Sequence, residues 1–135
     1  LPCRWHLAGG EHLRLRLGLF SAPCVTVALD GKRILGRKTV DLISTDHLTP
    51  EQRKGDSWET QRGYGYGLGV RVMTNPEMAG INGSVGEWGW DGAFGNWFCV
   101  DPKENLTCVY LTTNRPGEHY RFIPRLMASM YASLD

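Results

Sequence analysis

The segment from Gly86 to Pro102 carries the residues of this chain whose types could do chemistry. It places glycines at positions 86, 89, 92 and 95 among tryptophans at positions 88, 90 and 97. Each glycine costs roughly 0.5–1 kcal/mol of additional ordering entropy, so a segment that only fills a core rarely uses glycine at this density. Glycine in a strand instead favours close approach of another group to the backbone. Trp90-Asp91-Gly92-Ala93 is therefore predicted to be a strand that presents its backbone to a ligand, with aromatic walls.

The cysteines and histidines lack the spacing of a metal site, so we expect no metal and no other cofactor. The cysteines are at positions 3, 24, 99 and 108, without a Cys-x-x-Cys pair. If Pro102–Asn105 is a four-residue hairpin loop, Asp101 pairs with Leu106 and Cys99 lies opposite Cys108. Opposed Cβ atoms are about 4.5–5.5 Å apart, which makes a disulfide conceivable. Two small buried thiols in adjacent strands are the favoured interpretation.

The composition is that of an ordinary globular domain. The chain has 135 residues, of which 41% are hydrophobic and 21% charged, and its formal net charge is +1. This balance gives no electrostatic reason to expect nucleic acid as a partner. No apolar run approaches the roughly 20 residues that span a bilayer, so no membrane partner is expected either. The compartment is left open.

The elements that must position the candidate strand are read from hydrophobic periodicity. Residues 37–44 suit a short surface helix, and residues 49–57 are polar and loop-like. Residues 64–73 alternate with period two, with tyrosines on one face and glycines on the other, so another element can lie close against the glycine face. Residues 94–100 and 106–112 are predicted to form a hairpin. Together these strands predict an antiparallel three-stranded meander.

The C-terminal residues predict an amphipathic helix. Ile123, Leu126, Met127, Met130 and Tyr131 recur at helical spacing. Pro124 sits where this helix could begin. Its apolar stripe would cover one face of the sheet, which gives an α+β fold: an antiparallel β-meander covered by a C-terminal helix.

The residues from Trp90 to Leu106 resemble the C-terminal part of the serine β-lactamase-related superfamily. This superfamily includes class C-type β-lactamases, penicillin-binding DD-peptidases and β-lactamase-like esterases. Three other segments are similar to the same family: the Leu29-Asp-Gly-Lys turn, the Tyr64-Gly-Tyr-Gly-Leu-Gly-Val strand, and Leu111-Thr-Thr-Asn at the end of the last strand. The resemblance covers roughly residues 29–135 and implies the C-terminal part of a serine transpeptidase-like domain.

The resemblance also implies a chemistry. In members of the family, the serine of a Ser-x-x-Lys helix attacks a carbonyl carbon. That lysine and the tyrosine of a Tyr-x-Asn motif transfer the protons. A third motif, Lys-Thr-Gly in β-lactamases and often Trp-x-Gly in esterases, corresponds to Trp90-Asp91-Gly92. By the same resemblance, Trp90 would line an acyl pocket, Asp91 and Gly92 would lie along the substrate, and the Ala93 N–H would be a catalytic oxyanion-hole donor. From residue type alone, Asp91 is more simply a solvated or turn-stabilising carboxylate, and Tyr64 and Tyr66 are packing residues.

Two catalytic motifs of the family are missing from this chain. No serine is followed by lysine three positions later, and no tyrosine by asparagine two positions later. The first interpretation is therefore a fragment of a β-lactamase-related serine hydrolase whose parent cleaves a small ester or amide, inactive as given. The alternative is a stand-alone, non-catalytic binding or interaction module. As a fragment, the chain is expected to self-associate through exposed strand edges.

Residues 1–28 are left unassigned, and residues 29–135 are assigned to the β-lactamase-like domain. Glu11–Arg16 under one coding, read one base later, would give Ser-Thr-Tyr-Asp-Tyr-Ala, which is similar to a helix start in the family. A shifted reading frame over residues 11–28 is one hypothesis for this segment and disorder is another. Translation of the gene in all three frames tests the first.

Overall fold

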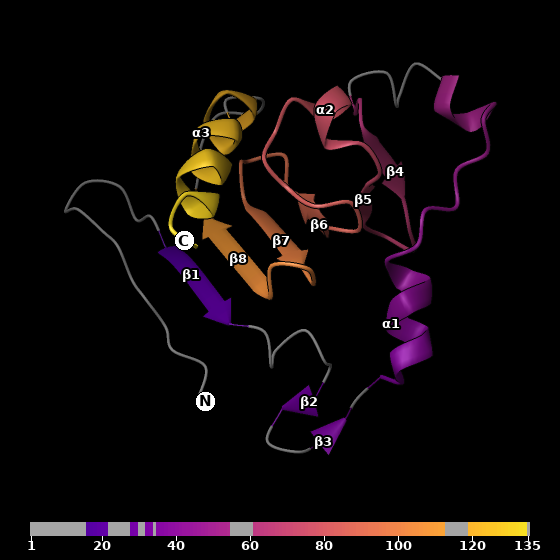
Figure 1. Ribbon diagram of the computed structural model, residues 1–135, viewed down its shortest axis with the longest axis horizontal. Helices are drawn as coiled ribbons and strands as arrows, with labels where there is room; N and C mark the ends of the chain where they lie inside the picture. The colour runs from indigo at the N-terminus through magenta and orange to yellow at the C-terminus, as the bar shows by residue number, and fades with distance from the viewer. Residues whose placement is uncertain are drawn as a thin grey trace.

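A computed structural model describes residues 16–21, 28–29, 32–33, 35–54, 61–112 and 119–134 (Figure 1). Its strands are Arg16–Ser21 (β1), Ala28–Leu29 (β2), Lys32–Arg33 (β3), Tyr64–Tyr66 (β4), Arg71–Met73 (β5), Trp88–Asp91 (β6), Trp97–Asp101 (β7) and Leu106–Leu111 (β8). Its helices are Arg37–Ile43 (α1), the short 3-10 helix Gln52–Lys54 (η2), Pro76–Ala79 (α2) and His119–Tyr131 (α3). The surface helix predicted over residues 37–44 is confirmed as α1.

The main sheet is antiparallel, with the order β1-β8-β7-β6-β5-β4. Strands β4 to β8 follow one another along the chain and across the sheet, so they form a meander, while β2 and β3 pair separately. Figure 1 shows α3 beside β7 and β8, and its apolar residues pack on them. The predicted fold class is confirmed, with more strands than the three expected.

The single strand predicted over residues 64–73 is wrong, because the chain turns back between Tyr66 and Arg71. The Gly67 amide donates to the Val70 carbonyl at 2.7 Å, and Gly69 has a φ of 85°, which side chains rarely adopt. As a result β4 and β5 form a hairpin in which Tyr64 lies opposite Met73. Opposed residues share a face, so the hairpin moves Tyr64 to the face of Met73 and Arg71.

The predicted close approach to the glycine face is confirmed at Gly65 and Gly67. A Cβ at Gly65 would lie 2.2 Å from the Asp46 carboxylate, and a Cβ at Gly67 would lie 2.0 Å from the Ile43 carbonyl oxygen. These glycines therefore make room for the end of α1 and for the segment that follows it.

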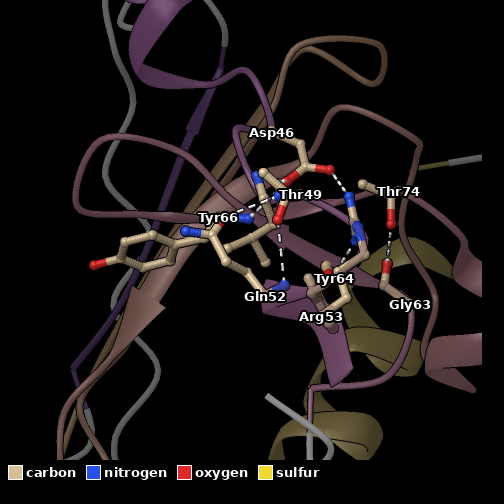
Figure 2. A network of polar contacts seen from close by, with 9 residues as sticks. Asp46, Thr49, Gln52, Arg53, Gly63, Tyr64, Tyr66 and Thr74 are labelled. Carbon is tan, nitrogen blue, oxygen red and sulfur yellow. Dashed lines mark hydrogen bonds and ion pairs between the residues drawn. The ribbon is translucent and has the colours of Figure 1, made fainter. Parts of the chain in front are cut away.

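The outer edge of β4 is closed by that same segment (Figure 2). The Tyr66 N–H donates to Asp46 Oδ1 at 3.1 Å, and the Tyr66 carbonyl accepts from the His47 N–H at 2.9 Å. Arg53 pairs with the other carboxylate oxygen of Asp46 and donates to the Tyr64 carbonyl at 3.4 Å. Because these groups are already bonded, Tyr64 and Tyr66 cannot pair with a further strand here. Self-association through other surfaces stays a prediction.

The hairpin of β7 and β8 has the predicted register. Asp101 pairs with Leu106 and Cys99 with Cys108. Both cysteines are free and fully buried, as the favoured interpretation expected. The first strand starts at Trp97 rather than Phe94, because residues 93–95 belong to the turn that precedes it.

Helix α3 begins at His119, so Pro124 lies inside the helix rather than at its start. Its apolar stripe is confirmed: Ile123, Met127 and Met130 pack with residues of β7 and β8, namely Trp97, Cys99, Leu106, Cys108 and Tyr110. This cluster is the core of the described chain, and it lies between α3 and one face of the sheet.

Strand β1 lies within the segment that the sequence left unassigned. It runs antiparallel to the whole of β8, from Arg16 opposite Leu111 to Ser21 opposite Leu106. Residues 1–15 and 22–27 lie outside the described residues, so a shifted reading frame and disorder stay hypotheses, as does the boundary at residue 29.

Candidate functional site

The Trp90–Ala93 segment lies at a step in the sheet. All four residues of β6 pair with β7, from Trp88 opposite Val100 to Asp91 opposite Trp97. On the other side β5 pairs only with Trp88 and Gly89. Among the described residues, the pairing with β5 therefore ends at Gly89, one residue before Trp90.

The turn after β6 is held by its own hydrogen bonds. The Gly92 amide donates to the Asn96 carbonyl at 2.7 Å, and the Gly95 amide donates to the Gly92 carbonyl at 2.9 Å. The side chain of Asn96 accepts from the Thr112 amide at 2.9 Å, which ties the turn to the end of β8. None of the hydrogen bonds among the described residues uses the Ala93 amide, so this exposed donor remains available to a ligand.

The Trp90 indole forms an exposed apolar wall beside this part of β6. Its side chain is 39% exposed, and its ring contacts that of Tyr66 edge-to-face, with 5.4 Å between the centroids. Phe94 and Leu68 are also exposed, at 58% and 55%. Tyr66 itself is fixed through its backbone by Asp46 and His47, as described above. The predicted wall of an acyl pocket therefore has a rigid aromatic neighbour, and its contact with a substrate stays a prediction.

Asp91 faces the other side of the sheet from Trp90, because successive side chains of a strand alternate. Its Oδ1 accepts from Arg71 Nη1 at 2.8 Å, and the two side chains are 17% and 5% exposed. The carboxylate is therefore largely buried and paired with Arg71, rather than solvated. Contact of Asp91 with a substrate stays a prediction, and its carboxylate is engaged in this ion pair.

Arg71 is a buried cation that sequence reasoning missed. Its guanidinium carbon lies 5.2 Å from the ring centroid of Tyr64 and 5.8 Å from that of Trp97. The alternation of residues 64–73 had grouped Arg71 with the glycines, and only the β4–β5 hairpin brings it under the aromatic rings. No signal in the sequence marks that turn apart from its glycines.

Glu87 is a second buried charge that the sequence did not mark. It is 0% exposed, and neither carboxyl oxygen has a hydrogen-bond partner among the described residues. Burial raises the pKa of Glu87 to about 8; Arg71 opposes this shift and Asp101 adds to it. At neutral pH this side chain is therefore mainly protonated.

Asp101 is the last residue of β7, and its carboxylate stabilises the hairpin turn that follows. Its Oδ1 accepts from the amides of Lys103 and Glu104 at 3.0 and 3.3 Å. Its Oδ2 also accepts from the Tyr131 hydroxyl at 2.6 Å and from the Ser84 amide at 3.2 Å. This fully buried carboxylate therefore joins the turn, the loop before β6 and helix α3.

The remaining candidates behave as packing or surface residues. Tyr64 is buried, and burial raises its pKa above the usual range. Burial likewise raises the pKa of Cys108 to about 12, and that of Cys99 further, so neither thiol is a nucleophile. His47 is exposed. In the part of the chain that the structure describes, no cluster of side chains could hold a metal ion and no helix could cross a membrane.

Known proteins resemble this chain over most of its length. Two Mycobacterium tuberculosis proteins, "Uncharacterized protein MT1414" of strain CDC 1551 and "Protein Rv1367c" of strain H37Rv, are each 34% identical to it over 96 residues. The match covers 65% of this chain but 23% of each relative. The chain therefore spans about a quarter of the length of the curated relatives it matches.

Solved structures share the fold. EstCE1, a hydrolase with promiscuous acyltransferase activity, superposes with a TM-score of 0.61 at 28% identity, over 75% of this chain and 26% of its own. A simvastatin synthase (LovD) variant from Aspergillus terreus gives 0.61 at 18% identity, over 75% and 30% of the two chains. A β-lactamase from Mycobacterium bovis gives 0.55 at 18% identity, over 74% and 38%.

The sequence model of the Beta-lactamase family matches residues 17–130. That range runs from β1 through the β4–β8 meander almost to the end of α3. The resemblance inferred from the residues around Trp90 is thereby confirmed, and this chain belongs to the β-lactamase family.

Proposed function

We propose that this chain forms the oxyanion-hole and acyl-pocket side of a serine hydrolase or acyltransferase site. The nucleophilic serine would come from a part of the protein that is not in this sequence. The observation that carries the proposal is the exposed Ala93 amide, which donates to no described group and follows the part of β6 that lies beyond the pairing with β5. An acyl substrate could lie along this part of β6 as an added strand.

In the proposed reaction, a serine hydroxyl attacks the substrate carbonyl carbon, and a neighbouring base takes its proton. Negative charge then develops on the carbonyl oxygen, which the Ala93 N–H stabilises. Such a donor is worth about 2.7–4 kcal/mol of barrier in enzymes where one has been removed. Collapse of the intermediate expels the alcohol or amine with a proton, and water or another acceptor releases the acyl group.

The surroundings of this part of β6 favour an uncharged acyl group. Trp90, Phe94 and Leu68 supply exposed apolar surface, and Tyr66 supports the Trp90 ring. The nearest buried charges, Arg71 and Asp91, neutralise each other on the other face of the sheet. A small ester or amide with an apolar acyl part is therefore the proposed substrate class. EstCE1 is a hydrolase with acyltransferase activity, which agrees with this chemistry.

A fluorophosphonate probe and a chromogenic short-chain ester test the proposal on the longer protein that carries this chain after a Ser-x-x-Lys segment. Labelling of a serine outside residues 1–135 together with ester turnover is expected. Ala93→Pro removes the amide N–H and should lower kcat about 10²–10³-fold, whereas Ala93→Ser keeps the N–H and should retain most activity. Circular dichroism checks that both variants fold.

Two outcomes contradict the proposal. If no such serine is labelled, the non-catalytic binding module becomes the better interpretation. If Ala93→Pro and Ala93→Ser lower kcat equally, the amide of Ala93 is not the oxyanion donor.

A further inference from the structure

A cavity of about 60 Å³ lies on the α3 side of the sheet, opposite to the face of Trp90. Arg71 and Asp91 line it from the strands, and Ile123 and Pro124 line it from α3. We propose that this cavity binds a short aliphatic monocarboxylate, such as propionate or butyrate, with its carboxylate on Arg71. The site is distinct from the proposed acyl pocket, because Trp90 and Asp91 alternate across the strand.

Arg71 supplies the polar end of the proposed site. It is only 4% exposed, and the rings of Tyr64 and Trp97 hold its guanidinium in place. A guanidinium carries five N–H donors in a planar fork that fits a carboxylate, and the contacts with Asp91 Oδ1 and the Tyr64 side chain engage only part of this set. A buried, preorganised arginine of this kind binds a carboxylate more strongly than a surface arginine does.

Apart from Gln61, the other walls of the cavity fit an alkyl chain. Ile81, Ile123 and Pro124 are apolar, and Ile123 belongs to the buried core. Each group the size of a water molecule needs about 10–15 Å³ of cavity volume. A cavity of about 60 Å³ therefore holds roughly four to six such groups. Propionate and butyrate have five and six non-hydrogen atoms, whereas a peptide or a longer fatty acid would not fit.

The charges inside the cavity determine whether a substitution strengthens or weakens binding of the carboxylate. Asp91 competes with the ligand for Arg71 and repels its carboxylate, so Asp91→Asn should tighten binding. Among the described residues that line the cavity, Arg71 is the cation, so Arg71→Met should abolish binding. These opposite signs separate the proposed site from a general attraction of anions to the protein surface.

The test is a titration of the chain with acetate, propionate, butyrate and neutral butyramide, followed by isothermal calorimetry and by shifts of the Trp97 indole NMR signal. Ionic strength is held constant with chloride. Affinity should rise about fourfold for each added methylene, and butyramide should not bind measurably. Arg125→Met, which removes an exposed arginine next to Pro124, is the control and should leave butyrate binding unchanged.

The comparison of the four ligands uses the wild-type chain alone. It therefore remains valid even if circular dichroism shows that Arg71→Met does not fold. Equal binding of butyramide and butyrate, or no binding of butyrate to the folded wild-type chain, would overturn the proposal. An equal loss in Arg125→Met and Arg71→Met, or weaker binding in a folded Asp91→Asn variant, would also overturn it. The outcome is independent of ester turnover, so the proposed function can fail or hold separately.

Discussion

Glu87→Gln is expected to remove most of the pH dependence of this fold between about pH 4.5 and pH 8. The carboxyl group of Glu87 is fully buried, has no described hydrogen-bond partner, and its pKa is raised from 4.5 to about 8. In this pH range the folded chain keeps the proton while the unfolded chain loses it. Stability must therefore fall as pH rises from about 4.5, and it becomes level above about pH 8.

The size of this loss of stability follows from the pKa shift of Glu87. Each pKa unit corresponds to about 1.36 kcal/mol, so the loss is about 3 kcal/mol at pH 7 and about 5 kcal/mol above pH 8. Domains of this size are stable by only about 5–15 kcal/mol, so this one carboxyl group decides how much of the chain is folded in mild alkali. Glutamine has nearly the same shape and no titratable proton, so Glu87→Gln should match the wild type in acid and exceed it above neutral pH.

Urea unfolding followed by tryptophan fluorescence at pH 5, 6.5 and 8 measures the effect. Glu104→Gln, an exposed substitution with the same change of charge, should follow the wild type at all three pH values. Carbon-detected NMR of the Glu87 carboxyl should give a titration midpoint near pH 8. Parallel stability curves for the wild type and Glu87→Gln would refute the reasoning, because they would mean that Glu87 titrates alike in both states.

Three further substitutions test the described contacts. Tyr131→Phe removes the 2.6 Å hydrogen bond to the buried Asp101 carboxylate and should cost about 1.5–3 kcal/mol in urea unfolding; Ser133→Ala, at an exposed helix end, should cost far less. Gly67→Ala would put a Cβ 2.0 Å from the Ile43 carbonyl and should cost about 1–3 kcal/mol, whereas Gly36→Ala, whose nearest atom is 3.8 Å away, should be nearly neutral by the same assay. Gly92→Ala should leave unfolding almost unchanged, because its nearest neighbours are 3.7 Å away, yet lower ester turnover by the longer protein if substrate lies along this backbone.

Periodicity and turn chemistry were enough to predict the elements farthest from the candidate site. The spacing of Ile123, Met127 and Met130 predicted α3, and the Pro102–Asn105 turn predicted the register that sets Cys99 opposite Cys108. Both predictions rest on local geometry that the fold leaves unchanged. The start of α3 was missed because a proline suits the first turn of a helix but is also found inside one.

The buried charges could not be predicted because they depend on contacts between distant residues. Arg71 meets Asp91 only after the β4–β5 hairpin and the β5–β6 pairing bring them together, and strict alternation along residues 64–73 gave the wrong face. Glu87 precedes β6 in a loop, where an acidic residue is expected in water. The Met73 N–H donates to the Glu87 carbonyl at 2.7 Å and ties this residue to β5, a contact that no pattern in the sequence predicts.

Glycine is unusually frequent in the region around Trp90, and the structure shows why most of these positions need a glycine. Within residues 61–112, most glycines have a positive φ or would place a Cβ under 3.0 Å from another atom: Gly63, Gly65, Gly67, Gly69, Gly80, Gly83, Gly86, Gly89 and Gly95. Gly92 alone in this range meets neither condition, because its φ is not positive and a Cβ would have ordinary contacts at 3.7 Å. The fold therefore gives no reason for the roughly 0.5–1 kcal/mol that a glycine costs here. A ligand that approaches the backbone between Trp90 and Ala93 supplies a reason, and this is the position where the proposed function requires one.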